Sequence, residues 1–82
     1  MSEKQQIADM LLTVTQMMVD NPDEVSVGIV ETPHNIAFRA KVAPLDREKL
    51  IGPGGRTERA LQNVLKVAGM KLNLNLILDI EQ

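Results

Sequence analysis

The sequence predicts a small α+β domain with the element order αββααβ. Three segments alternate apolar and polar side chains, which is the period of a half-buried strand. Two longer segments repeat apolar residues at helical spacing, and a short glycine-rich segment interrupts the helical pattern of the second half. A right-handed crossover places the third strand parallel to the second. We therefore expect a three-stranded mixed sheet covered on one face by three helices.

The first helix is predicted from about residue 3 to residue 19. Ser2 followed by Gln5 is the signature of a capping box. The apolar residues of one helical face follow, at Ile7, Met10, Leu11, Val14, Met17 and Met18. The turn over residues 20–23 ends this helix, because Pro22 disfavours helix at the residue before it and Asp and Asn favour turns.

Residues 25–30 and 36–42 are predicted to form an antiparallel hairpin. Each segment alternates with period two, and residues 32–35, which include a proline and an asparagine, separate them. Pro44 ends the second strand. Phe38, the only aromatic residue, falls on the apolar face, so we expect it in the core.

After Pro44, a short helix is predicted from Asp46, as its N-cap, to Ile51. A longer helix follows the glycine segment and runs to about Ala68, with Gly69 as its end. Residues 72–80 alternate strictly and predict a strand with its leucines buried. On the polar face of the sheet, Asn73, Asn75 and Arg39 are expected to be exposed.

The apolar stripe over residues 60–68 is broader than one packed helix face requires. One interpretation is self-association through Leu61, Val64 or Leu65, since a small domain gains core area by dimerising. The alternative is that this helix is simply packed between the sheet and the first helix.

Composition limits the protein to one domain, residues 1–82, with a small core. There is no cysteine, so neither a disulfide framework nor a thiolate metal site is expected, and a reducing cytoplasm suits the chain. No apolar run reaches membrane-spanning length, and residues 1–6 are polar, unlike a leader segment. We expect a cytoplasmic protein without membrane contact or cofactor.

The net charge of −2 is unevenly distributed. Residues 39–59 hold six basic residues against three acidic ones, whereas residues 1–38 hold six acidic residues and one lysine. Positive charge therefore gathers around the glycine segment, which is the sign that a nucleic acid requires.

That segment reads Leu50-Ile51-Gly52-Pro53-Gly54-Gly55-Arg56-Thr57 and contains a GxxG loop between two helices. Glycine lets the backbone approach a ligand closely, and the next helix offers free N–H groups and the positive end of its dipole. A four-residue loop cannot enclose a triphosphate, but it can hold a phosphodiester backbone. The plainer interpretation is a helix C-cap followed by a tight turn. A Walker A motif is excluded, because it would need a glycine at Leu50 and a lysine at Arg56.

The chain resembles the type II KH fold, and more closely the KhpA (YlqC) family of small bacterial single-KH RNA-binding proteins. The residues that carry this resemblance cover nearly the whole chain: residues 19–25, Val42-Ala43-Pro44, residues 50–57, Ala68-Gly69 and the tail to Ile80. The resemblance implies an RNA chaperone or post-transcriptional regulator with broad sequence tolerance. It also implies a homodimer, or a heterodimer with a second KH-domain protein, and no catalysis.

In this interpretation the loop binds the backbone of single-stranded RNA. Arg56 adds a charge-assisted contact, Lys49 and Arg59 flank the groove, and either Leu50 or Ile51 forms an apolar floor for the bases. The predicted RNA-binding residues are Lys49, Leu50, Ile51, Gly52, Pro53, Gly54, Gly55, Arg56 and Arg59.

Two other classes of function are weighed against RNA binding. An enzyme is disfavoured, because no nucleophile, base and orienting group converge in the sequence and His34 has no second histidine or cysteine beside it. A protein-interaction module is the stronger alternative, with the loop serving only as a turn. Salt dependence separates them, since a phosphate contact weakens with salt and apolar association changes little.

Overall fold

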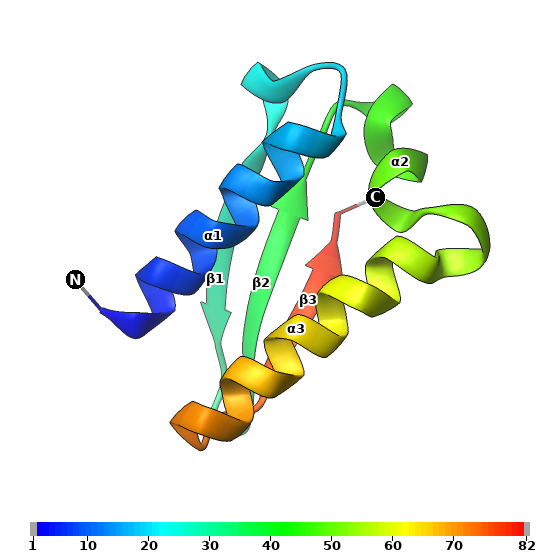
Figure 1. Ribbon diagram of the computed structural model, residues 1–82. Helices are drawn as coiled ribbons and strands as arrows, with labels where there is room; N and C mark the ends of the chain where they lie inside the picture. The colour runs from blue at the N-terminus through cyan, green and yellow to red at the C-terminus, as the bar shows by residue number, and fades with distance from the viewer. Residues whose placement is uncertain (1, 82) are drawn as a thin grey trace.

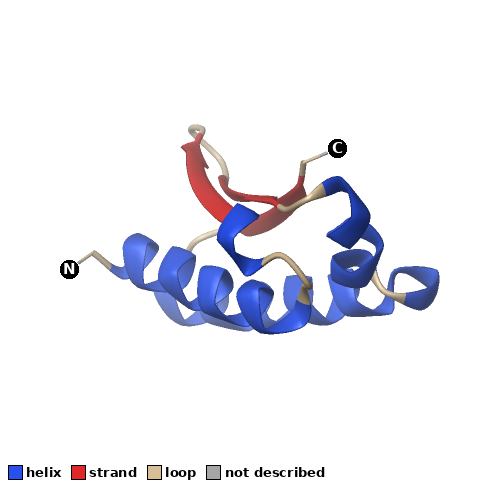
Figure 2. Cartoon of the chain, turned by 90° about the horizontal axis from the view of Figure 1, so that it is seen from above, coloured by secondary structure: helices blue, strands red, loops and turns tan. Residues whose placement is uncertain are grey.

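The computed structural model describes residues 2–81. One three-stranded sheet lies behind a layer of helices (Figures 1 and 2). The strand order is β1-β2-β3, with β1 (Ser26–Glu31) antiparallel to β2 (Ile36–Lys41) and β2 parallel to β3 (Leu76–Ile80). The predicted α+β class, the mixed sheet and the order αββααβ are confirmed.

Three helices cover the same face of the sheet: α1 (Glu3–Met18), α2 (Arg47–Ile51) and α3 (Arg56–Leu72). Helix α1 packs against β1, α3 packs against β3, and the short α2 packs against α3 near the end of β3 (Figure 1). Short 3₁₀ turns precede β1, α2 and α3, at Pro22–Glu24, Pro44–Asp46 and Pro53–Gly55.

The core lies between the sheet and the helices. Phe38 at the centre of β2 is fully buried, as predicted, and faces Ile29 and Leu78 in the registers of the two neighbouring strands. Leu11, Leu50 and Leu65 bring one buried side chain from each helix. The apolar alternation read from the sequence therefore gives the correct buried face in all three strands.

Helix α1 begins as the sequence predicts, although only half of the capping box forms. The Ser2 hydroxyl accepts a hydrogen bond from the backbone N–H of Gln5 at 3.2 Å. The Gln5 side chain does not return to Ser2, because it donates to Asp9 at 2.9 Å. One of the unpaired N–H groups of the first turn is thereby satisfied.

The boundary between α3 and β3 differs from the prediction. Helix α3 continues through Gly69 to Leu72 and ends at Asn73, which has a left-handed φ of 58°. A side chain at Gly69 would collide with the carbonyl of Leu74, so this glycine permits close packing and does not stop the helix. Consequently β3 starts at Leu76, and Leu74 is 39% exposed.

The expected polar positions are confirmed, since Asn73, Asn75 and Arg39 are all exposed. Arg39 pairs across the open face of the sheet with Asp79 at 3.0 Å. None of the helices in the described part of the chain is both long and apolar enough to cross a membrane.

Candidate functional site

All three glycines of the loop have positive φ angles. The φ angles are 79° at Gly52, 60° at Gly54 and 78° at Gly55, which only glycine adopts without cost. A side chain at Gly52 would collide with Thr57, whereas the position of a Cβ at Gly54 is open space. The tip of the loop therefore exposes bare backbone toward the solvent.

The N-terminus of α3 adjoins this loop and is not capped by a side chain. Its N-cap is Gly55, and no side-chain hydrogen bond caps the first turn of this 17-residue helix. The positive end of the helix dipole and its first N–H groups are thus directed at the loop. Such an end binds phosphate oxygens well.

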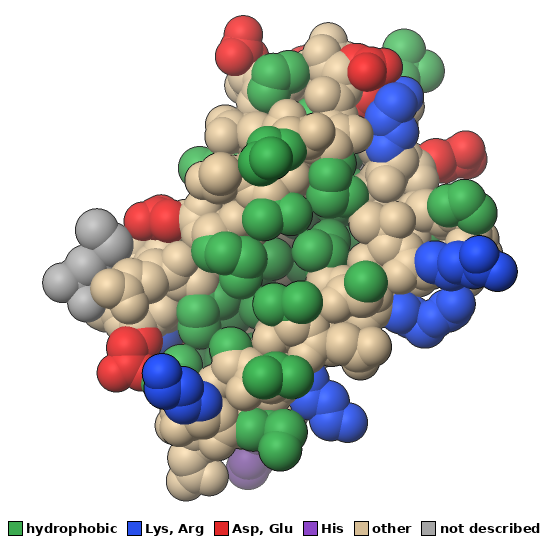
Figure 3. Space-filling view, viewed as in Figure 1, with side chains coloured by type: hydrophobic (Ala, Val, Ile, Leu, Met, Phe, Trp, Pro, Cys, Tyr) green, Lys and Arg blue, Asp and Glu red, His purple; other side chains and the backbone are tan. Residues whose placement is uncertain are grey.

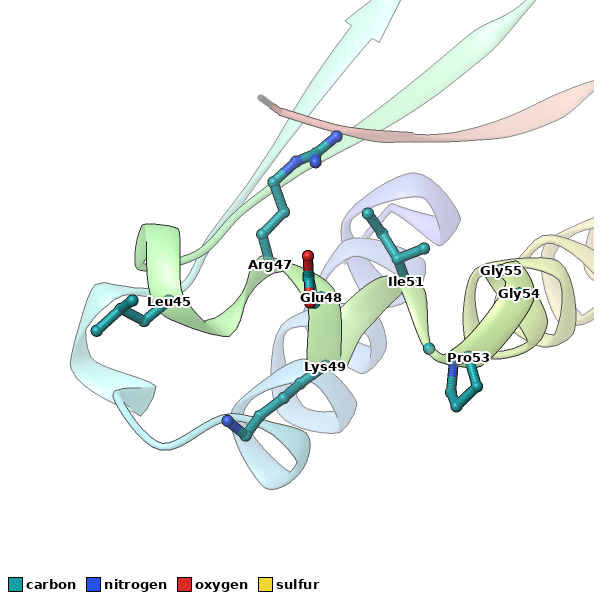
Figure 4. A pocket seen from close by; sticks show the side chains of 9 residues that line it. Leu45, Arg47, Glu48, Lys49, Ile51, Pro53, Gly54 and Gly55 are labelled. Atoms are coloured by element: carbon teal, nitrogen blue, oxygen red, sulfur yellow. The ribbon is translucent and has the colours of Figure 1, made fainter.

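The loop forms one wall of an open pocket of about 660 Å³ (Figure 4). Its other lining residues come from α2 and the turn before it, namely Leu45, Arg47, Glu48, Lys49 and Ile51. Ile51 is partly exposed and lines the pocket, whereas Leu50 is completely buried in the core. Of the two candidates for an apolar floor, Ile51 therefore lines the pocket, and Leu50 belongs to the core.

The three predicted cations have different surroundings. The Arg59 guanidinium donates to the Gly54 carbonyl at 2.9 Å, so this side chain lies directly against the loop. Arg56 is exposed at the first position of α3. Lys49 instead pairs with Asp20 at 3.1 Å, and Figure 4 shows its side chain directed away from the glycines. The hydrogen bond and the charge of Asp20 raise the pKa of Lys49.

Asp46 has a role that the sequence did not reveal. It occupies the predicted N-cap position of α2, but its side chain makes no capping bond. The buried carboxylate accepts hydrogen bonds from the backbone N–H of Asp20 at 3.2 Å and from the backbone and side chain of Asn21, both at 3.0 Å. This bridge fixes the start of α2 to the end of α1, and so positions the helix that leads into the loop.

Arg47 and Glu48 were also missed from the sequence. Arg47 lines the pocket one turn before Ile51, and both side chains point toward the strands in Figure 4. Arg47 and Ile51 are four residues apart and so share one side of a helix, and this spacing was the signal by which the sequence could have identified Arg47. The Arg47 Nε is buried without a hydrogen-bond partner. Glu48 adds a carboxylate to the same pocket, which opposes an anionic ligand.

The loop and its flanks offer no catalytic or metal chemistry. Within residues 2–81, no group of three histidine or acidic residues is placed to hold a metal ion. His34 lies in the hairpin turn and does not line the loop pocket. The pocket combines a bare backbone, the apolar side chain of Ile51 and the cation of Arg47 beside the N-terminus of α3, and these are features of a binding site.

Comparison with known proteins identifies the family. A model of the KhpA/KhpB KH domain matches residues 8–80, which is most of the chain. The chain belongs to the KhpA/KhpB KH-domain family. The predicted resemblance and the type II KH fold class are thereby confirmed.

Curated relatives agree with this assignment. The RNA-binding protein KhpA of Clostridium acetobutylicum is 39% identical over 71 residues, which cover 87% of this chain and 95% of the relative. The protein of the same name from Bacillus subtilis is 34% identical, over 82% of this chain and 83% of its own. The relatives are named as RNA-binding proteins, and membership of this family confirms the prediction that the chain is not an enzyme.

A solved structure shows the same fold in a larger protein. A point variant of Aquifex aeolicus Era, bound to GDP·AlF4⁻, superposes with a TM-score of 0.61 at 13% identity. The match covers 98% of this chain but only 31% of the Era chain. This likeness concerns the fold alone.

Proposed function

We propose that this protein binds single-stranded RNA, holding the phosphodiester backbone against residues 52–55. The observation that carries the proposal is the loop itself, with three glycines of positive φ beside the uncapped N-terminus of α3. Arg56 and Arg59 supply positive charge, and Ile51 supplies an apolar surface for a base. Leu50 lies in the core against which Ile51 packs, and Lys49 forms an ion pair with Asp20.

Recognition of this kind tolerates many sequences, because phosphate contacts carry no base information. The pocket residues include no aromatic platform for stacking, and Phe38 is buried. An RNA chaperone or post-transcriptional regulator in the bacterial cytoplasm fits such binding, and the names of the bacterial relatives support an RNA ligand.

Replacing Arg56 with alanine tests this function. With two or three phosphates neutralised, the affinity of the wild type for oligo(U) should fall roughly tenfold between 50 and 200 mM salt. Arg56→Ala should weaken binding to oligo(U) and oligo(A) to the same extent and reduce the salt slope by about 0.7. Fluorescence anisotropy measures both quantities.

Arg39→Ala is the matched control, since Arg39 is exposed but lies on the open face of the sheet, paired with Asp79. It should leave the salt slope unchanged. Equal losses in the two variants would show that only general charge attracts RNA, and a salt-independent affinity would contradict the phosphate contact itself.

A second function, association with another KH domain, is favoured by an apolar groove between α1 and α3. Figure 3 shows apolar side chains gathered there. A hollow of about 430 Å³ lies in the groove, lined by Ile7, Met10, Ala68 and Leu72 together with polar residues. Beside it, Val64 and Val67 are 50% and 68% exposed. The expected contact residues Leu61 and Leu65 are buried in the core, so the contact surface on α3 is Val64 with Val67.

We expect Val67→Asp to disrupt a dimer formed by two copies of the chain. Burial of a valine contributes about 1.5 kcal/mol or more, so the dissociation constant should rise at least tenfold. Analytical ultracentrifugation measures it. Lys66→Asp, at an exposed position of the same helix that is not three or four residues from Val64 or Val67, should leave the mass unchanged. If the wild type stays monomeric at high micromolar concentration, a second KH-domain protein is the partner to test. If the groove binds neither a second copy of the chain nor such a protein, this function is contradicted.

A further inference from the structure

Helix α3 exposes a face that the glycine loop does not use. Positions spaced by three or four residues lie along one side of a helix. One such series is exposed throughout and carries three cations, two amides, one methionine and no acid: Arg56, Arg59, Asn63, Lys66, Met70 and Asn73. We call these six residues the basic stripe.

The charge of the basic stripe is not neutralised by the protein. Within residues 2–81 the basic side chains that form ion pairs are Lys4, Arg39 and Lys49, so no ion pair joins an acid to the stripe. Along α3 there are four basic residues and a single acid, Glu58, which lies outside the spacing of the stripe. This concentration stands out in a chain with a net charge of −2. A positive stripe on an acidic protein indicates an anionic ligand.

The stripe ends at a second pocket, of about 510 Å³, at the opposite end of α3 from the loop. Its lining combines one cation, an imidazole and amides with an apolar surface: Lys66, His34, Asn73, Asn75, Gly69, Met70, Leu74 and Leu76. Met70 is 75% exposed. In Figure 3 the single histidine lies beyond the end of α3, and Lys and Arg side chains lie along the outer side of this helix between it and the loop.

This lining matches the parts of a nucleotide. An ammonium such as that of Lys66 contacts phosphate, and the amide of Asn73 can donate to or accept from a base edge, whereas the Asn75 amide donates to Asn35. An imidazole or an exposed methionine offers a surface on which an unstacked base can rest. No member of this set selects a single base, which suits binding without strict sequence preference.

We propose that single-stranded RNA leaving the glycine loop continues along the basic stripe to a second nucleotide-binding subsite formed by Lys66, His34, Asn73 and Met70. This inference rests on the proposed RNA-binding function of the loop. Because α3 has 17 residues, the two sites lie about 25 Å apart along the helix axis. A KH loop holds about four nucleotides, so a tetranucleotide occupies the loop alone, and a strand about three times longer reaches both sites.

The test compares oligo(U) of four and of twelve nucleotides on two lysine variants of the same helix. Lys66→Ala should weaken binding of the twelve-nucleotide RNA about threefold to tenfold and lower its salt slope by about 0.7, with less than a twofold effect on the four-nucleotide RNA. Lys71→Ala is the matched control, because Lys71 is also exposed on α3 but borders the groove with α1. It should change neither affinity more than twofold.

His34→Ala provides a second variant, on a different element from Lys66. It should weaken binding of the twelve-nucleotide RNA about twofold or more, at an unchanged salt slope, since its contact is to a base. If both lysine variants lose affinity equally, or if Lys66→Ala affects the two RNA lengths alike, the second subsite is contradicted while RNA binding stands. If the wild type binds neither RNA, the proposed function itself fails.

Discussion

Replacing Asp46 with alanine is expected to lower the melting temperature by roughly 10 °C or more, measured by circular dichroism. The Asp46 carboxylate is buried and accepts hydrogen bonds from the backbone N–H groups of Asp20 and Asn21. Its removal leaves these partly buried donors without an acceptor, which costs far more than the loss of an exposed hydrogen bond. Asp23→Ala, an exposed change of equal charge in the turn that follows α1, should shift the melting temperature by only a degree or two.

The same carboxylate should make the protein sensitive to acid. Burial raises the pKa of Asp46, but hydrogen bonds from Asn21 and Asp20 and the charge of Lys49 together outweigh it, so the pKa lies below that of an ordinary aspartate. The unfolded chain therefore takes up this proton at a higher pH than the folded chain. The contribution of Asp46 to the free energy of unfolding is present above about pH 4, and it is lost as the pH falls through the pKa that Asp46 has in the folded chain.

Asp46→Asn should consequently lose less stability than the wild type between pH 7 and pH 3, although it starts from a lower value. Urea unfolding at each pH measures the difference. Identical acid dependence in the two proteins would show that Asp46 does not titrate as its hydrogen bonds require.

Most of the fold was predictable because the apolar periodicity of each segment agrees with its position in the sheet or on the helices. The error at Gly69 arose where two patterns overlap. Leu72 and Leu74 continue the alternation of β3 backward, although Leu72 belongs to the last turn of α3. Asn73 was the available signal, since asparagine is the residue after glycine that most readily ends a helix in a left-handed conformation.

The loop was predictable from the sequence, but its surroundings were not. A GxxG segment between two helical patterns is a local signal, and its backbone conformation follows from glycine. The bridge from Asp46 to Asn21 joins residues 25 apart, so no local pattern reveals it. Whether Leu50 or Ile51 enters the core likewise depends on how α2 is rotated against the core, and only the three-dimensional packing determines this rotation.

Two sides of helix α3 carry its unusually broad apolar pattern, one buried in the core and one exposed, and a third side carries the basic stripe. Leu61 and Leu65 enter the core, Val64 and Val67 remain exposed near α1, and the basic stripe follows another side. A helix buried on one face alone would show one apolar stripe. Val64 is four residues from Ala68 in the groove, whereas Val67 is three residues from Met70 and four from Asn63 of the basic stripe, so Val67 lies between the two surfaces. Dimerisation would bring two RNA sites into one assembly and raise the effective concentration of the second site for an RNA that is bound at the first.

Replacing both Pro53 and Gly54 with aspartate is expected to reduce affinity for single-stranded RNA at least tenfold while the fold survives. Both residues are exposed at the tip of the loop, and a side chain at Gly54 would enter open space. Aspartate tolerates the left-handed conformation of Gly54 better than most residues do. Two carboxylates would then stand where the phosphodiester approaches, and like charges at close range repel strongly.

The matched control is the double substitution of Pro53 and Gly54 with asparagine, which adds side chains of the same shape without charge. If repulsion of phosphate causes the loss of affinity, the asparagine variant should retain most of the wild-type affinity at 50 mM salt. The difference in affinity between the two variants should become smaller at 200 mM salt, because salt screens the added charge. Circular dichroism should give the same spectrum for both, since these side chains contribute nothing to the core. Should the folded aspartate variant bind oligo(U) as tightly as the wild type, the loop is only a turn, and association through α1 and α3 becomes the function that the structure supports.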